Sequence, residues 1–240
     1  QVEAIRKTVK KFKTGNQMLW NAKMRFGKTL TALQVAKECR FEHILILTHR
    51  PVVSDGWYDD FGKIFYDTDY VFGSKTKGED ISHLIDTDKK FVYFASMQDL
   101  RGSESVGGKF DKNDEIFLTK WDFVVIDEAH EGTLTKLGQA VIDTITDLSD
   151  NPKILRLSGT PFNLLDKFKE DEIYTWDYVM EQRAKLEWNM AHFGDPNPYA
   201  ALPELHIFTY NLDKLIPGYM DVEDSAFNFR EFFLTWTSNV

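Results

Sequence analysis

The stretch Met18–Thr29, MLWNAKMRFGKT, decides the fold. Its start is apolar enough for a buried strand, and from Lys28 apolar residues recur at helical spacing. A loop between a strand and a helix directs backbone N–H groups and the helix dipole at one spot. Gly27 suits a tight turn, Lys28 can reach the β and γ phosphates, and the Thr29 hydroxyl can ligate magnesium. The stretch therefore predicts a phosphate-binding loop.

Ala22 departs from the pattern GxxxxGK[ST], because it stands where the pattern has its first glycine. Alanine still permits a close turn, but the alternative is an ordinary strand-to-helix turn. The position in the chain favours phosphate binding, since such a loop follows the first strand of a doubly wound fold.

Short apolar runs alternate with amphipathic segments on both sides of this loop, a pattern typical of a parallel sheet covered by helices. The expected strands are Met18–Asn21, His43–Thr48, Asp69–Phe72, Phe91–Ala95, Phe123–Ile126 and Lys153–Leu157. The expected helices are Val2–Phe12, Lys28–Cys39, Val52–Phe65 and Leu134–Asp147. The sequence thus predicts an α/β fold with a mostly parallel sheet.

Later segments are less regular. The Gly, Ser and Lys-rich stretch Gly102–Asp114 predicts a mobile loop. Beyond Pro161 we expect an appendage with a helix over Asp171–Trp188, an apolar alternation over Leu205–Tyr210 and a helix over Ala226–Thr237.

Composition narrows the class of protein. The 240 residues fit one large domain with or without an extension, and 42% hydrophobic residues exclude a disordered chain. Apolar runs are far shorter than the roughly 20 residues of a membrane span, which predicts a soluble protein. The single cysteine, Cys39, excludes a disulfide framework and fits the cytoplasm. A net charge of -9 argues against a basic nucleic-acid coat but allows a local basic face.

A second motif follows an apolar run. Phe123–Ile126 leads directly into Asp127-Glu128-Ala129-His130, so a buried strand would deliver two acids to the carboxyl edge of the sheet. Asp127 can hold Mg²⁺, and Glu128 can orient or deprotonate a water that attacks the γ-phosphate. The alternative is a solvated helix start, where acids are also favoured.

These segments together resemble a known family. AKMRFGKT (Ala22–Thr29), VVIDEAH (Val124–His130) and LSGTPF (Leu157–Phe162) look like motifs I, II and III of superfamily 2 helicases and translocases, in the same order. With TWDYVMEQ (Thr175–Gln182), the text is most similar to the res-type motor subunit of restriction enzymes. The resemblance covers residues 1–165 well and the remainder loosely.

The resemblance implies a RecA-like lobe over residues 1–165 that binds ATP and Mg²⁺. Residues 166–240 would be an extension or linker toward a second RecA-like lobe missing from this chain, and the lobe alone would be a weak or inactive ATPase. The roles implied are cofactor binding by Gln1, which would recognise adenine, and by Ala22, Gly27, Lys28, Thr29 and His130, metal binding by Thr29 and Asp127, and catalysis by Lys28, Asp127 and Glu128. Coupling of the nucleotide state to the strand is implied for Ser158, Gly159 and Thr160, together with His130.

DNA is the partner that the resemblance implies, with a nuclease or specificity subunit as further partners and no membrane. The residues placed at the nucleic-acid backbone are His49, Arg50, Ser96, Gln98 and Arg101. Solvated loops are the alternative for these five. Two other functions remain open: an ATP-dependent switch that does not translocate, and a small-molecule kinase, which Glu128 beside the metal ligand disfavours.

Overall fold

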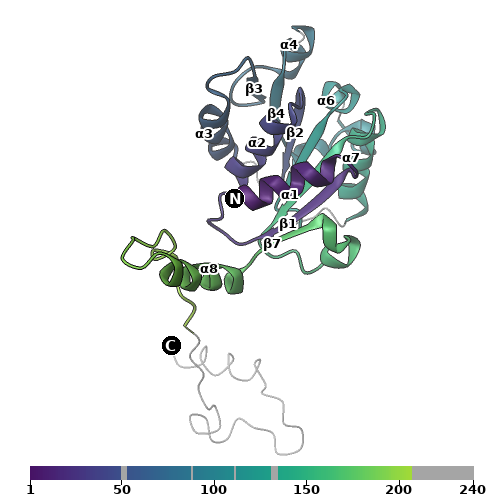
Figure 1. Ribbon diagram of the computed structural model, residues 1–240. Helices are drawn as coiled ribbons and strands as arrows, with labels where there is room; N and C mark the ends of the chain where they lie inside the picture. The colour runs from purple at the N-terminus through teal and green to yellow at the C-terminus, as the bar shows by residue number, and fades with distance from the viewer. Residues whose placement is uncertain (50–52, 88, 111, 131–134, 207–240) are drawn as a thin grey trace, which may run out of the picture. The chain divides into compact units, whose positions relative to one another are not determined.

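The computed structural model describes residues 1–49, 53–87, 89–110, 112–130 and 135–206, and it confirms the α/β fold (Figure 1). Within these residues seven parallel strands form one sheet in the order β3-β4-β2-β5-β6-β1-β7. Since all strands run the same way, their carboxyl ends share one edge. The strands are β1 (Gln17–Ala22), β2 (His43–Thr48), β3 (Val71–Ser74), β4 (Phe91–Ser96), β5 (Phe123–Asp127), β6 (Lys153–Ser158) and β7 (Ile173–Trp176).

The six strands predicted from the sequence are confirmed to within about two residues. The helices are α1 (Val2–Phe12), α2 (Lys28–Cys39), α3 (Ser54–Phe65), α4 (Ile81–Asp86), α5 (Met97–Leu100), α6 (Asp114–Leu118), α7 (Lys136–Asp147) and α8 (Tyr178–Ala191). Short 3-10 turns are η2 (Glu104–Val106), η3 (Leu165–Lys167) and η4 (Glu170–Glu172). The predicted starts of α3 and α7, Val52 and Leu134, lie outside the described residues. The helices α4 to α6 span at most six residues, too few to show a helical period.

Both faces of the sheet are buried, which explains why the sequences of its central strands are continuous runs of apolar residues. In β2, Ile44 and Ile46 lie in the core beneath α1, α2 and α3, whereas Leu45 and Leu47 lie in the core beneath α4 to α7. Successive side chains of a strand point to opposite faces, so a doubly covered strand needs apolar residues at every position. The sheet is therefore a rigid platform for the loops at its carboxyl edge.

The segment after β6 corrects one expectation. A single helix over Asp171–Trp188 is wrong in its first part, because Ile173–Trp176 is strand β7. Tyr174 pairs with Trp20 of β1, packs against its ring and is only 4% exposed. Helix α8 begins after Asp177, whose side chain accepts a hydrogen bond from the third residue of the helix. Ile, Tyr, Thr and Trp are residue types favoured in strands, so pairing with β1 agrees with the local preference of these four residues.

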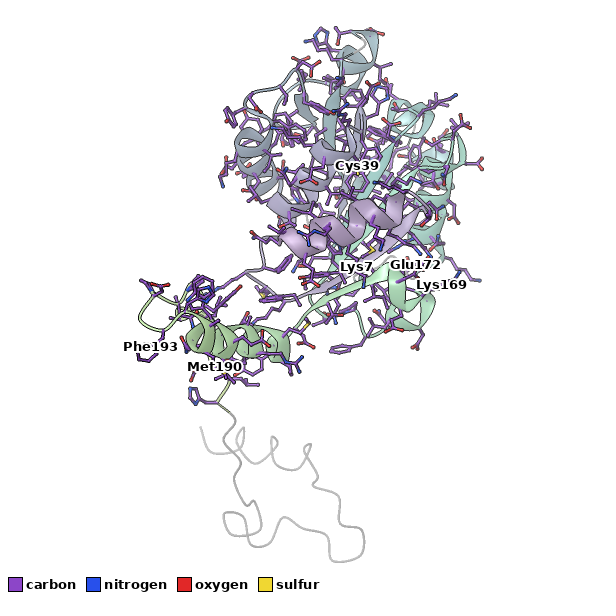
Figure 2. All side chains as sticks on the ribbon, viewed as in Figure 1. Lys7, Cys39, Lys169, Glu172, Met190 and Phe193 are labelled. Carbon is purple, nitrogen blue, oxygen red and sulfur yellow. The ribbon has the colours of Figure 1, made fainter. Side chains whose placement is uncertain are left out.

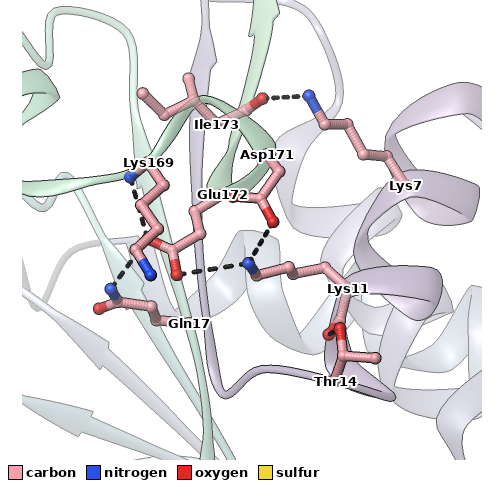
Figure 3. Close-up of polar contacts among 8 residues, drawn as sticks. All are labelled: Lys7, Lys11, Thr14, Gln17, Lys169, Asp171, Glu172 and Ile173. Atoms are coloured by element: carbon pink, nitrogen blue, oxygen red, sulfur yellow. Dashed lines mark hydrogen bonds and ion pairs between the residues drawn. The ribbon is translucent and has the colours of Figure 1, made fainter.

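A group of polar contacts around Glu172 fastens α1 to the amino end of β7, and we name it the Glu172 clamp (Figure 3). Lys11 Nζ lies 3.4 Å from Glu172 Oε1, while Gln17 Nε2 and the backbone N–H of Lys169 donate to Oε2 at 3.0 Å. Nearby, Lys7 donates to a backbone carbonyl of β7 at 2.6 Å. Glu172 is 7% exposed, whereas Lys11 and Gln17 are half-buried and Lys169 is exposed.

The chain divides into two compact units, Gln1–Asp195 and Pro196–Val240. In the first unit, Met190 in the last turn of α8 and Phe193 just beyond that helix are exposed apolar side chains (Figure 2). In the second unit only residues 196–206 are described, so most of Leu205–Tyr210 and all of Ala226–Thr237 lie outside the described residues. None of the described helices has the length and apolar character needed to cross a membrane.

The stretch predicted as a loop, Gly102–Asp114, contains η2 and a local bridge between Ser103 and Phe110. The Ser103 side chain is fully buried and its Oγ accepts a hydrogen bond from Asn113 at 2.9 Å. The described part of this loop is therefore held together by internal polar contacts.

Candidate functional site

The loop between β1 and α2 needs a glycine at Gly27. This residue caps α2 with a left-handed backbone, φ 83°, which favours glycine. A Cβ added to Gly27 would lie 2.6 Å from the side-chain amide nitrogen of Gln1, too close without a shift. That amide donates to the carbonyl of Phe26 at 2.8 Å, so the structure brings Gln1 against the loop. The left-handed backbone thus restricts position 27, whereas the close contact is with the flexible end of the Gln1 side chain.

The Lys28 ammonium lies inside this loop. It donates to the carbonyl of Ala22 at 2.7 Å and to that of Lys23 at 3.4 Å. Burial lowers the pKa of Lys28, while the charges of Glu128 and Asp127 oppose that shift. Thr29 follows on the first turn of α2 and is partly exposed. The loop therefore holds a cation and a hydroxyl at the amino end of a helix, where anions are favoured.

Asp127 ends β5 at the same edge of the sheet. Its Oδ1 accepts the backbone N–H of Glu128 at 3.0 Å, and its Oδ2 accepts the indole N–H of Trp57 at 3.3 Å. Burial raises the pKa of Asp127, and the neighbouring charge of Glu128 raises it further. Glu128 turns the chain with a left-handed backbone, φ 49°, an uncommon conformation for a side-chain-bearing residue. Two acids therefore meet at one edge with little compensating positive charge.

His130 joins this acidic turn to the end of β6. Its Nδ1 lies 2.8 Å from Ser158 Oγ and 3.4 Å from Glu128 Oε2. Ser158 is fully buried, and its Oγ also accepts the backbone N–H of Thr160 at 3.1 Å. The hydroxyl of Ser158 therefore links His130 to the turn that follows β6.

Gly159 brings that turn to the phosphate loop. A Cβ added there would lie 4.0 Å from Lys28 Nζ and 3.8 Å from the carbonyl of Ala22, which are ordinary contact distances. The three segments predicted as motifs I, II and III thus meet at the carboxyl ends of β1, β5 and β6.

The residues predicted to contact nucleic acid lie along the other half of the same edge. Ser96 ends β4 and Gln98 follows it, and both border a cavity of about 440 Å³ at the ends of β3 and β4. His49 follows β2, whereas Arg50 lies outside the described residues. Arg101 Nη2 donates to Thr135 Oγ1, the cap of α7, at 3.4 Å. Ser96 and Gln98 share a cavity, while Arg101 is engaged with α7.

The Ser54 hydroxyl also borders this cavity, from the first residue of α3. Within the described part of the chain, the Oγ atoms of Ser54 and Ser96 are buried without a hydrogen-bond partner. Buried polar atoms normally have partners. Ser54 and Ser96 therefore line the cavity with their hydroxyl oxygens buried in its wall.

Two residues near the loop were not singled out by the sequence. Trp57 contacts Asp127 as described above. Glu181 of α8 accepts an ion pair from Lys23 at 2.7 Å and is only 2% exposed. Glu181 falls within TWDYVMEQ, a segment that the sequence resemblance included without assigning a role. Neither pairing is encoded by spacing, because each joins segments more than 60 residues apart.

The residues at this edge fit a magnesium ion that also contacts phosphates. Among the described residues no group of three or more His, Cys, Asp or Glu side chains is placed to hold a metal. Magnesium commonly takes only one or two protein carboxylates and completes its shell with phosphates and water. The Asp127 carboxylate, whose pKa is raised by burial and by Glu128, is an anion that a cation would stabilise.

Comparisons with known proteins agree with this geometry. Residues 1–163 match the family described as type III restriction enzyme, res subunit. A protein of Mycoplasma pneumoniae, provisionally named as the C-terminus of a type II restriction enzyme and methyltransferase, is 28% identical over 258 residues. The match covers 89% of this chain and 35% of that protein. The chain therefore spans about a third of the curated relative it matches.

Two solved structures are similar in fold. The SWI2/SNF2 ATPase core of Sulfolobus solfataricus, in complex with double-stranded DNA, gives a TM-score of 0.52 at 20% identity, over 71% of this chain and 32% of that one. A nuclease-deletion mutant of the Type ISP restriction-modification enzyme LlaGI, bound to a DNA substrate mimic, gives 0.50 at 13% identity, over 81% and 22% respectively. At these identities the likeness supports the fold alone.

Proposed function

The chain belongs to the type III restriction enzyme res subunit family, as a helicase-type N-terminal ATPase lobe, and we propose that it binds and hydrolyses ATP to drive movement on DNA. The protein containing it would act in restriction-modification or a related defence reaction. The observation that carries this proposal is the meeting of Lys28, Asp127 and the His130–Ser158 pair at one edge of the sheet.

Binding of the polyphosphate is assigned to the loop between β1 and α2. The N–H groups at the start of α2 would face the phosphates, and the Lys28 ammonium would exchange its carbonyl partners for phosphate oxygens. Gln1 already contacts the loop, which supports a role for its amide in recognising adenine. Ala22 and Gly27 shape the loop through their backbone.

Asp127 and Thr29 would hold a magnesium ion, which when bound would offset the charge of the phosphates. Asp127 suits this role because its carboxylate oxygens are oriented by Glu128 and Trp57 and retain lone pairs for a cation. Glu128 follows directly and would accept a proton from the attacking water. Its side chain is about one-third exposed, which leaves it accessible to water.

Coupling is assigned to the contact between His130 and Ser158. His130 Nδ1 lies 3.4 Å from Glu128 Oε2 and 2.8 Å from Ser158 Oγ. A change at Glu128 would therefore act on His130 and, through it, on Ser158. Ser158 in turn holds Thr160 through its backbone N–H. Gly159, beside Lys28, would let the same turn respond to the phosphate loop.

DNA is proposed to run along the ends of β2 and β4. His49, Ser96 and Gln98 lie there, and Ser54 adds a buried hydroxyl to the same cavity. Hydroxyl and amide side chains commonly bond to phosphate and sugar. Arg50 and Arg101 remain candidates from the sequence.

Magnesium-dependent ATP hydrolysis that rises several-fold with DNA and falls with salt is the expected behaviour of the protein that contains this lobe. Indifference to DNA would instead favour the switch function.

Lys28→Ala tests the nucleotide site. We expect at least a tenfold loss of ATP affinity in calorimetry, because the variant removes the cation from the loop while keeping a good helix former. Lys37→Ala is the matched control, since Lys37 lies on the same helix with its ammonium bonded to Asp67 at 2.6 Å, far along from the loop. Equal ATP affinity in Lys28→Ala and the parent chain would refute the assignment.

A further inference from the structure

Trp57 contacts Asp127, a residue of the proposed magnesium site, from helix α3. The first residue of α3 borders the cavity at the ends of β3 and β4. Trp57 is 1% exposed, and its indole N–H donates to Asp127 Oδ2 at 3.3 Å. The ring is part of the core that α1, α2 and α3 form on one face of the sheet. The donor is therefore held in place by packing.

The Asp127 carboxylate is held through both of its oxygens. Oδ1 accepts from the backbone of Glu128 and Oδ2 accepts from Trp57. A carboxylate has about four lone-pair positions, so two hydrogen bonds fix its plane and leave positions for a cation. Partners of this kind orient metal-binding carboxylates and tune their affinity.

Helix α3 also reaches the proposed path of DNA. Ser54, its first residue, precedes Trp57 by three positions and therefore lies on the same side of the helix. Ser54 borders the cavity that Ser96 and Gln98 share. One turn of helix thus separates a cavity-lining serine from the donor that contacts Asp127.

We propose that Trp57 is a positioning residue that orients the Asp127 carboxylate for the metal of the ATP site, and that it ties this carboxylate to the helix bordering the cavity at β3 and β4. The inference rests on the proposed function, because it takes Asp127 as a metal ligand. A purely structural Trp57 would affect folding and leave metal affinity unchanged.

Trp121 provides a matched control. It is also 1% exposed, and its indole N–H also donates a hydrogen bond, to the carbonyl of Ile116 at 2.9 Å. It lies in the core on the opposite face of the sheet. Trp57→Phe and Trp121→Phe therefore remove the same group and the same volume, but only one of them removes a partner of Asp127.

The test measures Mn²⁺ binding at saturating ADP by electron paramagnetic resonance, with Mn²⁺ as the probe for the Mg²⁺ site. We expect Trp57→Phe to weaken Mn²⁺ binding by about 10- to 100-fold, as for other partners of metal ligands. Trp121→Phe should bind Mn²⁺ within about threefold of the parent chain, although both variants lose thermal stability. Equal Mn²⁺ affinity in the two variants would overturn the proposal.

A second replacement separates the hydrogen bond from the packing. 3-Benzothienylalanine keeps the bicyclic shape of tryptophan but lacks its N–H, so it avoids a cavity. Placed at position 57 it should reproduce the loss of Mn²⁺ affinity, and placed at position 121 it should not. If the parent chain and Asp127→Asn bind Mn²⁺ equally, the proposed function fails; if Asp127→Asn alone loses binding, only the role of Trp57 fails.

Discussion

Glu172 and Asp127 are acids removed from water at opposite ends of the sheet. Glu172 precedes β7, where burial would raise its pKa, but hydrogen bonds from Lys169 and Gln17 and the charge of Lys11 outweigh this and leave the pKa lowered. Asp127 ends β5, where burial and the charge of Glu128 leave its pKa raised despite Trp57 and Lys28. One carboxylate is compensated within the fold, whereas the other is not.

Because of this difference, we infer that Glu172 stabilises the fold, whereas Asp127 would be stabilised by a bound cation. Compensated charges at the amino edge bind α1 to β7, as the Glu172 clamp does. Uncompensated charge at the carboxyl edge costs stability and is retained where a ligand supplies the missing charge. Neutralising the acid should therefore change the stability of the fold in opposite directions at the two places: Glu172→Gln should lower it and Asp127→Asn should raise it.

The largest expected effect is on the rate of hydrolysis. In the protein that contains this lobe, Glu128→Gln should lower kcat for ATP hydrolysis by about 10²- to 10⁴-fold, because it removes the proposed proton acceptor. ATP affinity should stay within about threefold, since Lys28 and the loop are untouched. Steady-state ATPase assays and calorimetry provide the two numbers. A Glu128→Gln variant that hydrolyses ATP at the parent rate would remove Glu128 from the mechanism.

Next in size is the loss of stability at the clamp. Glu172→Gln should lower the free energy of unfolding by about 1–3 kcal/mol, because it breaks a charge-assisted network in a buried position. For a domain of this size Tm should fall by about 3–10 °C. Differential scanning calorimetry measures the change. The ATP affinity of the folded variant should not change, and a loss of ATP binding at temperatures where it is folded would contradict the division between the two edges.

The pH dependence of stability should differ in sign between the two acids. The pKa of Glu172 is lowered from 4.5, so it contributes stability above that value, and the contribution is lost as pH falls through the folded pKa. The pKa of Asp127 is raised from 3.8, so the folded protein loses stability as pH rises from that value through the folded pKa.

Denaturant unfolding in metal-free buffer between pH 3.5 and 7 tests this difference. Relative to the parent chain, Glu172→Gln should become less stable as pH rises, and Asp127→Asn should become more stable. Differences of the same sign for both variants would show that the charge of one of the two acids is misassigned.

The smallest effect is expected at Gly159. The added methyl group of Gly159→Ala would meet Ala22 and Lys28 at 3.8 to 4.0 Å, which requires no movement. The free energy of unfolding should stay within about 0.5 kcal/mol of the parent value, and the ATPase rate should stay within about twofold. A tenfold fall in rate would show that the turn needs glycine flexibility.

Much of the fold could be predicted because the signals were local. The phosphate loop at Gly27 and Lys28 lies between a strand and a helix whose bounds follow from apolar periodicity. The strand over Ile173–Trp176 was missed because it is four residues long and depends on pairing with β1. The sequence cue that could have found it is Asp177, a residue type favoured at helix starts, just before Tyr178.

The site was predictable in its residue types and not in its supporting contacts. Lys28, Asp127 and Ser158 each end or follow a predicted strand, so parallel strands bring them to one edge. Trp57 reads as an ordinary core residue of an amphipathic helix, and its bond to Asp127 depends on how α3 packs on the sheet. Such pairings carry no periodic signal, because they depend on side-chain direction across 70 residues of chain.

Nucleotide-induced stabilisation tests the central claim most directly. Tm is measured with and without saturating MgATP for the parent chain, Asp127→Asn and Glu172→Gln. A ligand at 100 times its Kd stabilises the folded state by about 2.7 kcal/mol. We predict a clear rise in Tm for the parent chain, the same rise from a lower starting Tm for Glu172→Gln, and little or none for Asp127→Asn. A full rise for Asp127→Asn, or none for the parent chain, would contradict a magnesium-dependent ATP site at the carboxyl edge of the sheet.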